Sequence, residues 1–353
     1  MSKIRIGVIG AGGASGAHLG MMAKHDCFEV AAIADVVEAP AKERAERFGI
    51  ERWTTDRQDI LGDKSIEAVL ITTPPVVHAE IAIEALRAGK HVFCEKPLAK
   101  TTDECRQVLD AVRQTGLVFV LGYPMRHSPE AQNLRQQIQS GRIGRPVWYR
   151  DMWAVNRGSP AKTIHDAQLG GGVVYESSHW FDFVLWTFGP VKRVYAHTAR
   201  FKPDDTTADD TAFVHIEFVS GDSAFWSESW SAPGFGFKPT CVARHGRPHL
   251  DVIGPGGSMH FPDADGKFVL SCYENKDRGV PHGEPINPTE QWPWKNDWGA
   301  NMVVTFPAEH RNFYDCIRSG AAPQCRAEDG AAVIELIEAI LESNRTGTSV
   351  NLV

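Results

Sequence analysis

Short apolar strands alternate with amphipathic helical stretches over the first 121 residues, and this alternation is what most restricts the fold. Candidate strands lie at 4–9, 30–34, 68–72, 91–94 and 118–121, and candidate helices at 16–24, 39–48, 78–88 and 102–115. The pattern is typical of β-α-β units, in which helices cross over a parallel sheet. It predicts an α/β domain with a parallel sheet over residues 1–122.

The pattern changes after Gly122. A helix is expected at 129–140, a strand at 147–153 and, after three glycines at 170–172, an apolar helix at 176–188. Closely spaced strands with short turns fill 191–273, and two helices follow at 309–319 and 328–344. Close spacing of this kind favours antiparallel pairing. The sequence therefore predicts a second, α+β domain over residues 123–353, with a large open and mostly antiparallel sheet.

The composition is that of an ordinary folded chain. At about 100–200 residues per domain, 353 residues suggest two domains. The chain has 37 basic and 44 acidic residues, a formal charge of -7, which does not favour nucleic acid or an anionic membrane as a partner. No apolar run approaches the roughly 20 residues that span a bilayer.

The cysteines point to a reducing compartment. There are seven, an odd number, with no Cys-x-x-Cys pair, which argues against a disulfide framework. Lys3 and Arg5 precede a stretch of small residues, as in a signal peptide. The glycines in this stretch favour a strand that runs into a turn over an apolar helical segment. We therefore expect a cytoplasmic protein.

The turn after the first strand carries the strongest local motif. Gly10, Gly12 and Gly13 are followed by Ala14 and the small Ser15, directly between a strand and a helix. In a Rossmann domain such glycines permit a tight turn and let backbone amides approach a pyrophosphate at the helix N-terminus. The motif predicts a dinucleotide site, whereas a glycine-rich turn without a ligand is the alternative.

Asp35 ends the second strand, a little over 20 residues beyond the first glycine. A carboxylate there can accept hydrogen bonds from the adenosine ribose, and it disfavours the 2'-phosphate of NADP. No Arg or Lys follows it directly, because Val36, Val37 and Glu38 come next. NAD is expected as the cofactor in preference to NADP; a helix N-cap is the other role open to Asp35.

Further motifs stand at later strand ends. Thr73-Pro74 and His78 follow the third candidate strand, and Glu95-Lys96-Pro97 follows the fourth. The second half adds His179 and Asp182 after the triple glycine, and Gly254-Pro255-Gly256-Gly257-Ser258. Together these motifs resemble the glucose-fructose oxidoreductase, inositol dehydrogenase and rhizopine-catabolism (Gfo/Idh/MocA) family over nearly the whole chain.

The resemblance implies a function and a set of site residues. Members of this family oxidise or reduce a secondary alcohol or carbonyl on sugars, cyclitols and related compounds with NAD or NADP. They often form dimers or tetramers through the C-terminal sheet. Carried over to this chain, Lys96 stands at the nicotinamide end of the site with Glu95 beside it, and His179 faces the substrate.

The chain departs from the family pattern in two places. Relatives usually carry an acidic residue four positions before the histidine; here Tyr175 has that spacing and Glu176 is three before His179. Either Glu176 or Tyr175 is thus the candidate for that role. At 122–127 many relatives have an Asn and two arginines, and only Arg126 remains in that register.

The residue types suit hydride chemistry. Histidine, with an ordinary pKa near 6.5, can accept a hydroxyl proton near neutral pH, and lysine can polarise the reacting oxygen. The hypothesis is that His179 is the general base and Lys96 orients the alcohol. Residues before the triple glycine are expected to line a substrate pocket: Trp153, Arg157, Lys162 and His165.

Other functions are weighed against this one. His245 and His249 are four apart, but Gly246 and Pro248 make the two-ligand face of a helix unlikely there, so no metal site is expected. A glycoside hydrolase that uses NAD transiently shares the same motifs. A non-catalytic dinucleotide or sugar sensor is the third possibility, which the joint presence of Lys96 and His179 disfavours.

Overall fold

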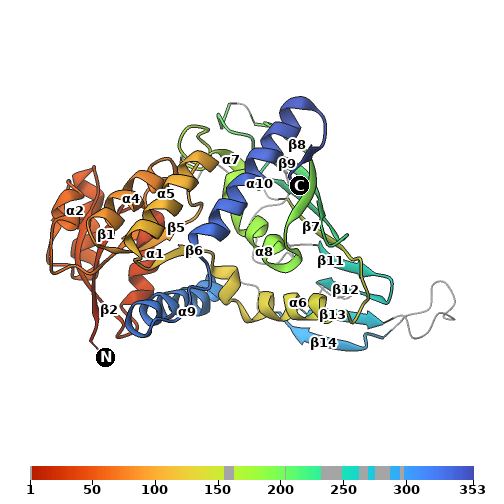
Figure 1. Cartoon of the computed structure of the whole chain (residues 1–353), viewed down its shortest axis with the longest axis horizontal. Coiled ribbons are helices and arrows are strands. Elements are labelled where there is room, and N and C mark those ends of the chain that lie inside the picture. Colours follow the sequence, from red (N-terminus) through yellow and green to blue (C-terminus); the bar gives the residue numbers. More distant parts are fainter. Residues whose placement is uncertain are drawn as a thin grey trace. The chain divides into compact units, whose positions relative to one another are not determined.

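A computed structural model of the chain describes residues 2–154, 163–202, 204–231, 249–261, 269–274, 287–294 and 298–353. Contacts group it into two units (Figure 1). The first unit comprises residues 1–128 and 302–335, and the second comprises 129–301 and 336–353. The boundary expected between residues 122 and 123 lies six residues before the division after residue 128. The late segment 302–335 also groups with the first unit.

The first unit is built on a six-stranded parallel sheet in the order β3-β2-β1-β4-β5-β6. Its strands are β1 (Ile4–Ile9), β2 (Phe28–Ala34), β3 (Trp53–Thr54), β4 (Ala68–Ile71), β5 (His91–Glu95) and β6 (Phe119–Gly122). This is the doubly wound order of a Rossmann domain, in which ligands bind beyond the carboxyl ends of the strands near β1 and β4. The predicted fold class is confirmed.

Helices connect these strands: α1 (Gly13–Met22), α2 (Glu38–Phe48), α3 (Gln58–Leu61), η1 (Pro75–Val77), α4 (His78–Arg87), α5 (Thr102–Thr115) and η2 (Pro124–His127). α5 has the predicted bounds, since Thr101 and Glu104 form a capping box that fixes its start. α1 begins three residues earlier than expected, inside the glycine turn. The short elements β3, α3, η1 and η2 were not predicted.

One late helix completes the core of the first unit. α9 (Trp298–Ser319) begins eleven residues before its predicted start, although Pro307 lies inside it. Phe313 and Tyr314 of α9 are buried in the same apolar cluster as Ile6 and Phe28. The Arg318 guanidinium also pairs with Glu67 at 2.7 Å. The Rossmann core therefore depends on residues near the C-terminal end of the chain.

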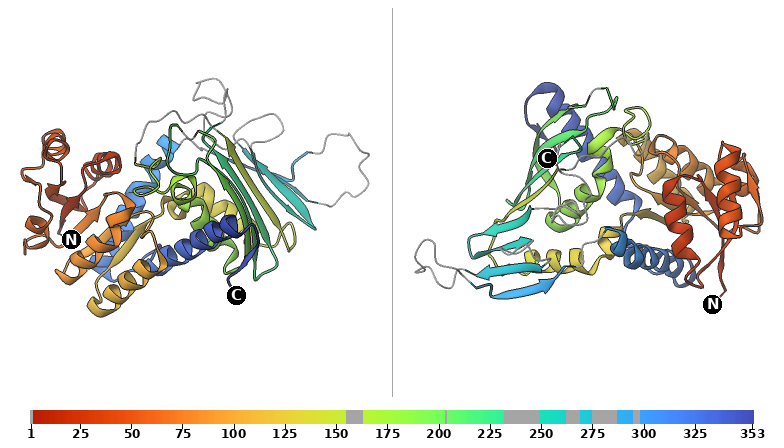
Figure 2. Two further views of the ribbon diagram at one scale, coloured as in Figure 1. Left: turned by 90° about the horizontal axis from the view of Figure 1, so that it is seen from above. Right: turned by 180° about the vertical axis from the view of Figure 1, so that it is seen from behind.

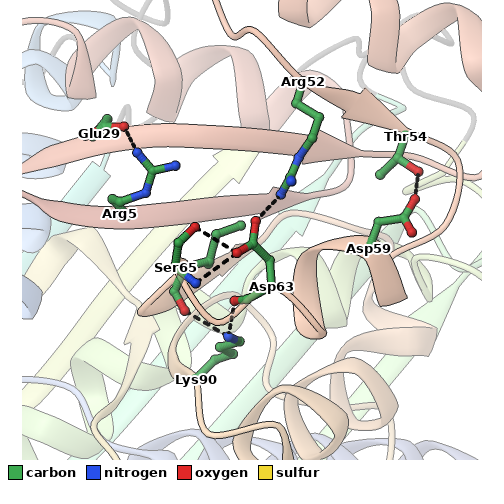
Figure 3. Close-up of polar contacts among 9 residues, drawn as sticks. Arg5, Glu29, Arg52, Thr54, Asp59, Asp63, Ser65 and Lys90 are labelled. Carbon is green, nitrogen blue, oxygen red and sulfur yellow. Dashed lines mark hydrogen bonds and ion pairs between the residues drawn. The ribbon is translucent and has the colours of Figure 1, made fainter.

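The amino ends of the strands are held by a buried lysine (Figure 3). Lys90 donates to the carbonyl oxygens of Asp63 (2.6 Å) and Ile66 (2.8 Å), just before β4. Burial lowers the pKa of Lys90. Hydrogen bonds from Ser65 and Arg52 hold the pKa of the Asp63 carboxyl well below its usual range. This cluster is structural, because the dinucleotide edge of a Rossmann sheet is the opposite one.

The second unit contains a nine-stranded sheet in the order β14-β13-β12-β11-β7-β10-β9-β8-β15. All its strand pairs are antiparallel except β7 with β10. The strands are β7 (Trp148–Ala154), β8 (Val191–Ala199), β9 (Thr211–Phe218), β10 (Ser223–Ser229), β11 (His249–Gly254), β12 (Gly257–Phe261), β13 (Val269–Glu274), β14 (Glu290–Pro293) and β15 (Val350–Asn351). The expected open, mostly antiparallel sheet is confirmed.

Helices cover one face of this sheet (Figure 2): α6 (Pro129–Gln139), α7 (Gly172–Glu176), α8 (Ser178–Phe188) and the end of α10 (Ala327–Thr346). Trp180 and Phe181 of α8 pack on Trp226 of β10, and Trp180 also contacts Tyr149 of β7. On the opposite face Trp148, Phe213 and Tyr195 are exposed. The alternating burial along β9 and β10 follows from this one-sided cover.

Candidate active site

The glycine turn has the geometry that a dinucleotide needs. Gly10 has a φ of +102°, and a Cβ there would lie 2.7 Å from backbone atoms of Thr72 and Thr73. At Gly12 and Gly13 an added Cβ would meet nothing within 4 Å. No side chain caps α1 at Gly12, so its first N–H groups stand at an uncapped helix N-terminus. Such an end binds a pyrophosphate.

Asp35 is tied to that turn. Its Oδ2 accepts the backbone N–H of Ala11 at 2.8 Å, and its Oδ1 accepts that of Val37 at 2.9 Å. The carboxylate is therefore fixed beside the turn, and its remaining lone pairs can accept ribose hydroxyls. Val36 and Val37 are exposed next to it. Asp35 does not cap α2, whose N-cap is Val37.

Arg44 of α2 lies beside the glycine turn, a position that the sequence did not predict. Its Nη2 donates to the Gly12 carbonyl at 3.4 Å, and its guanidinium atoms lie 3.2–3.4 Å from where a Cβ on Gly16 would be. A cation thus lies against the glycine turn. Arg44 stands nine residues beyond Asp35, outside the positions directly after it where a positive charge was expected to matter.

His78 joins the loops after β4 and β5. Its Nδ1 lies 2.7 Å from the Pro97 carbonyl oxygen and its Nε2 lies 2.8 Å from that of Thr73. His78 is buried, and this burial lowers its pKa. The ring thus links the loop after β4 to the loop after β5. The predicted place of His78 in the cofactor site stays a prediction.

Glu95 and Lys96 stand at the carboxyl end of β5, and both are partly exposed. The Lys96 backbone N–H donates to Glu95 Oε2 at 3.1 Å. Glu95 Oε1 lies 2.7 Å from His18 Nε2, behind the turn. The peptide between Lys96 and Pro97 is cis. Strand order brings this pair to the same sheet edge as the glycine turn, Asp35 and Thr73.

These residues fit a dinucleotide. Space is open above Gly12 and Gly13, and the buried Thr73 Oγ1 has no hydrogen-bond partner within the described ranges. Buried hydroxyls normally have one. The turn would hold the pyrophosphate, Asp35 the ribose and the Thr73-Pro74 loop the next part of the cofactor. Ser15 serves the turn itself, because its hydroxyl donates to the Gly12 carbonyl at 2.7 Å.

In the second unit, the triple glycine sets the start of the histidine segment. Gly172 has a φ of +81°, and a Cβ there would lie 2.4 Å from the Asp209 carbonyl oxygen. Val173 N–H donates to that same oxygen at 2.9 Å. Only glycine allows this approach, which anchors α7 against the segment before β9.

The expected single helix at 176–188 is interrupted. α7 ends at Glu176 and α8 starts at Ser178, with Ser177 between them. Because of this break, three- and four-residue spacings do not place Tyr175, Glu176 and His179 on one helical face. Tyr175 is buried, whereas Glu176 and His179 are partly exposed. Asp182 is fully buried in α8.

Glu228 of β10 is a second residue that the sequence reasoning missed. It is buried, its Oε2 accepts the Ser177 hydroxyl at 2.6 Å, and its Oε1 accepts the Trp230 indole N–H at 2.5 Å. The carboxylate thus holds the α7–α8 junction. The sequence signal for this role is an acidic residue at a strand position where the alternation predicts a buried, apolar side chain.

The remaining candidates have varied surroundings. Arg126 is buried and donates to the Gln324 carbonyl at 2.8 Å, with Asp329 3.3 Å away. His165 is buried edge-on to the Trp230 ring, and Trp153 is partly exposed on β7. Arg157 and Lys162 lie outside the described residues, as does His245. The substrate roles of all these residues stay predictions.

Metal binding has no structural support in the described part of the chain. No group of three or more His, Cys, Asp and Glu side chains there is arranged to hold an ion. His249 lies in β11, a strand.

The chain matches a known family in both units. Residues 4–123 match the oxidoreductase family with an NAD-binding Rossmann fold, and residues 131–260 match the GFO/IDH/MocA C-terminal domain.

Curated relatives and a solved structure resemble the whole chain. Levoglucosan dehydrogenase of Pseudarthrobacter phenanthrenivorans is 32% identical over 97% of this chain and 96% of its own. Scyllo-inositol 2-dehydrogenase (NAD(+)) of Bacillus subtilis is 26% identical over 91% and 87%. A levoglucosan dehydrogenase structure with NADH and L-sorbose is 25% identical, covers 100% of both chains and has a TM-score of 0.82. The chain belongs to the Gfo/Idh/MocA family of oxidoreductases with an NAD-binding Rossmann fold, as the sequence resemblance implied.

Proposed function

We propose that this chain is an NAD-dependent dehydrogenase that transfers a hydride between the nicotinamide and a secondary alcohol or carbonyl of a sugar, cyclitol or glycoside. The observation that carries the proposal is the Glu95–Lys96 pair at the end of β5, on the same sheet edge as the glycine turn and Asp35. The names of the levoglucosan and inositol dehydrogenases support a ring-shaped, hydroxylated substrate.

The chain's own residues handle the proton and the orientation of the alcohol. NAD, when bound, supplies the hydride acceptor. Lys96 donates a hydrogen bond to the reacting oxygen, and His179, the second residue of α8, accepts the hydroxyl proton. Glu176 fills the usual acidic place, because Tyr175 is buried while Glu176 is partly exposed.

Residues of the second unit would set substrate specificity. Trp153 offers an aromatic face on which a sugar ring can stack, and His165 stands close to Trp230. Arg157 and Lys162 would donate hydrogen bonds to hydroxyl groups of the substrate. Arg126 would act by supporting the loop after β6, since its guanidinium already bonds Gln324 and pairs with Asp329.

The test is a panel of sugars, anhydrosugars, inositols and glycosides, each offered with NAD and with NADP. NADH formation and glycoside cleavage are measured in parallel. Net NADH formation on a sugar or cyclitol supports the dehydrogenase. Cleavage without net NADH formation would replace it by the redox hydrolase, and tight NAD binding with neither activity would replace it by a sensor.

Two variants test the assigned roles. Lys96→Ala and His179→Ala should each lower kcat by about 10²- to 10⁴-fold, the usual contribution of a positioned acid or base, with NAD affinity nearly unchanged. Lys64→Ala and His197→Ala, at exposed positions in the same two units, are matched controls. Near-normal turnover of His179→Ala would remove that residue from the mechanism.

We also propose that two copies associate through the uncovered face of the nine-stranded sheet. An apolar patch lies there, made of Trp148, Met152, Tyr195, Phe213, Phe225 and Ile253. Contiguous exposed apolar surface of this kind marks an interaction site, and a symmetric pairing of the same patch would cover it in both copies. A homodimer is the simplest assembly; a second such interface would give a tetramer.

A cytoplasmic location is part of the same proposal. Cys27, Cys94, Cys272 and Cys316 are buried and form no disulfide within the described ranges, which suits a reducing compartment. Among the helices that the structure describes, none combines the length and apolar character needed to cross a bilayer.

A further inference from the structure

A row of three histidines, of which His18 and His310 are fully buried, leads from Glu95 through the first unit. His18 Nε2 lies 2.7 Å from Glu95 Oε1, and His18 Nδ1 lies 2.8 Å from His310 Nε2. His310 Nδ1 lies in turn 3.2 Å from His25 Nε2. We call these four side chains the histidine chain. It joins the end of β5, α1, α9 and the loop after α1 into one unbroken series of hydrogen bonds.

Apolar rings enclose the chain. His18 stacks on Phe306 with centroids 4.4 Å apart and meets the edge of Phe93 at 5.4 Å. His310 meets Phe93 at 5.9 Å and Phe28 at 6.2 Å. Within this wall, His18 and His310 each use both ring nitrogens on members of the chain. Apolar residues would fill such a core without the cost of burying polar groups. A stabilising role therefore does not explain why the histidine chain is there.

Burial keeps His310, the middle ring of the three histidines, neutral near pH 7. Burial, together with His18, His25 and His127, lowers the pKa of His310 well below its ordinary value. Burial also lowers the pKa of His25, with Asp26 opposing and Arg311 assisting. His127, whose own pKa is lowered by burial and by Arg126, is the further titratable group that acts on His310. A neutral imidazole donates from one nitrogen and accepts at the other.

We propose that the histidine chain is a proton relay between the Lys96 end of the active site and solvent at His25. The inference rests on the proposed dehydrogenase function, because oxidation of an alcohol releases one proton per hydride transferred. The relay is a second route for the hydroxyl proton of the substrate. This route leads through Lys96, whereas the first leads through His179.

The transfer is balanced at every step. The Lys96 ammonium gives a proton to Glu95 and takes the substrate proton in its place. Glu95 Oε1 passes a proton to His18 Nε2, and His18 releases the one on its Nδ1 to His310 Nε2. His310 then releases its Nδ1 proton to His25 Nε2, and His25 loses its own from Nδ1. One proton enters, one leaves, and only O–H and N–H bonds change.

The outer end, His25, is the most exposed of the three histidines. His25 lies in the short loop between α1 and β2 and is partly exposed, whereas His18 and His310 are fully buried. Its Nδ1 is covered and has no hydrogen-bond partner within the described ranges. A turn of this ring toward solvent therefore delivers the proton. A flip of each ring about its Cβ–Cγ bond, which exchanges the places of Nδ1 and Nε2, restores the starting state without carrying the proton back.

The test compares His25→Ala and His310→Phe with the wild type in stopped flow, following NADH absorbance and a pH-indicator dye together. We expect kcat to fall about 10- to 100-fold in both variants, below the effect of losing the base itself. Proton release should lag behind NADH formation, the solvent isotope effect on kcat should rise, and imidazole in the buffer should restore His25→Ala. Lys64→Ala, at an exposed position of the same unit, is the control. NAD affinity checks that each variant is folded, and the partly exposed His25 keeps the test available if His310→Phe does not fold.

The two possible failures are separable. A wild type that forms no NADH from any sugar or cyclitol would overturn the dehydrogenase and the relay with it. An active wild type, with proton release synchronous with NADH formation in His25→Ala and no rescue by imidazole, would overturn the relay alone.

Discussion

The Asp35 carboxylate accepts the backbone N–H of Ala11 at 2.8 Å, so the residue proposed to bind the ribose is tied to the turn proposed to bind the pyrophosphate. One side chain thus couples two parts of the dinucleotide site. Changes at Asp35 should therefore alter cofactor selectivity and the shape of the glycine turn together.

Asp35→Ser should weaken NAD binding by about tenfold or more and raise the relative affinity for NADP. The reason is that hydrogen bonds to a charged acceptor contribute about 1.5–3 kcal/mol, and about 1.4 kcal/mol is tenfold in Kd. Calorimetric titration with both cofactors measures the change. Glu38→Ser, on the first residue of α2, is the control. An unchanged ratio of the two affinities would remove Asp35 from cofactor selection.

Arg44→Ala should weaken the binding of NAD and of ADP-ribose by similar factors, because its guanidinium lies at Gly12, where the pyrophosphate would bind. We expect about a tenfold loss, corresponding to one charge-assisted hydrogen bond. Arg44→Lys should recover part of it. Arg47→Ala, on the same helix but stacked over Phe48, should leave both affinities unchanged. Equal effects of the two alanine variants would contradict a phosphate contact by Arg44.

Glu228→Gln should lower the free energy of unfolding by about 1–3 kcal/mol, because one of the donors on Ser177 and Trp230 loses its buried acceptor. Urea denaturation followed by Trp fluorescence gives the value. Glu217→Gln, on the uncovered face beside Arg193, should cost at most about 1 kcal/mol, as exposed ion pairs do. If the two variants were equally stable, Glu228 would have no special role at the α7–α8 junction.

The protein should lose stability as the pH falls below neutrality. Burial, with a contribution from Arg126, lowers the pKa of His127 to about 4 from 6.5. Between these values the unfolded chain binds more protons, so the free energy of unfolding falls with falling pH, by up to about 1.4 kcal/mol per pH unit for this group. Burial of His78 and His310 acts in the same direction. Urea denaturation over this window should show a shallower slope for His127→Gln; an identical slope would contradict the assignment.

Trp148→Glu should shift the protein toward the monomer, because it places a charge in the apolar patch beside Phe225. Sedimentation velocity measures the distribution. Val219→Glu is the matched control, since Val219 is equally exposed but follows the end of β9. A wild type that is monomeric at micromolar concentration would overturn the proposed pairing.

Local patterns were enough to predict most of the first unit. Gly10, Asp35, Thr73 and Glu95 were found because each directly follows an apolar strand, and carboxyl ends of parallel strands meet at one sheet edge. The helix at 102–115 carried its own capping box. Such signals act over a few residues and are visible without a structure.

Features that depend on distant segments could not be predicted in the same way. His18 and His310 are 292 residues apart, and nothing near either one indicates the other. The break at Ser177 depends on Glu228, a residue of another strand. The unpredicted first part of α9 contains Phe306, which stacks on His18 of α1, a residue far away in the sequence. These positions are fixed by tertiary contacts, which override local propensity.

The place of α9 in the first unit affects how the chain folds during synthesis. Residues 1–128 leave the ribosome early, but their core lacks Phe313 and Tyr314 until the segment 302–335 has followed. At about 5–20 residues per second, the intervening stretch takes about 10–40 s to make. During that interval the nascent sheet exposes the apolar surface that α9 will cover. Chaperone capture should therefore concentrate on chains that already contain β1–β6 and still lack their last helices.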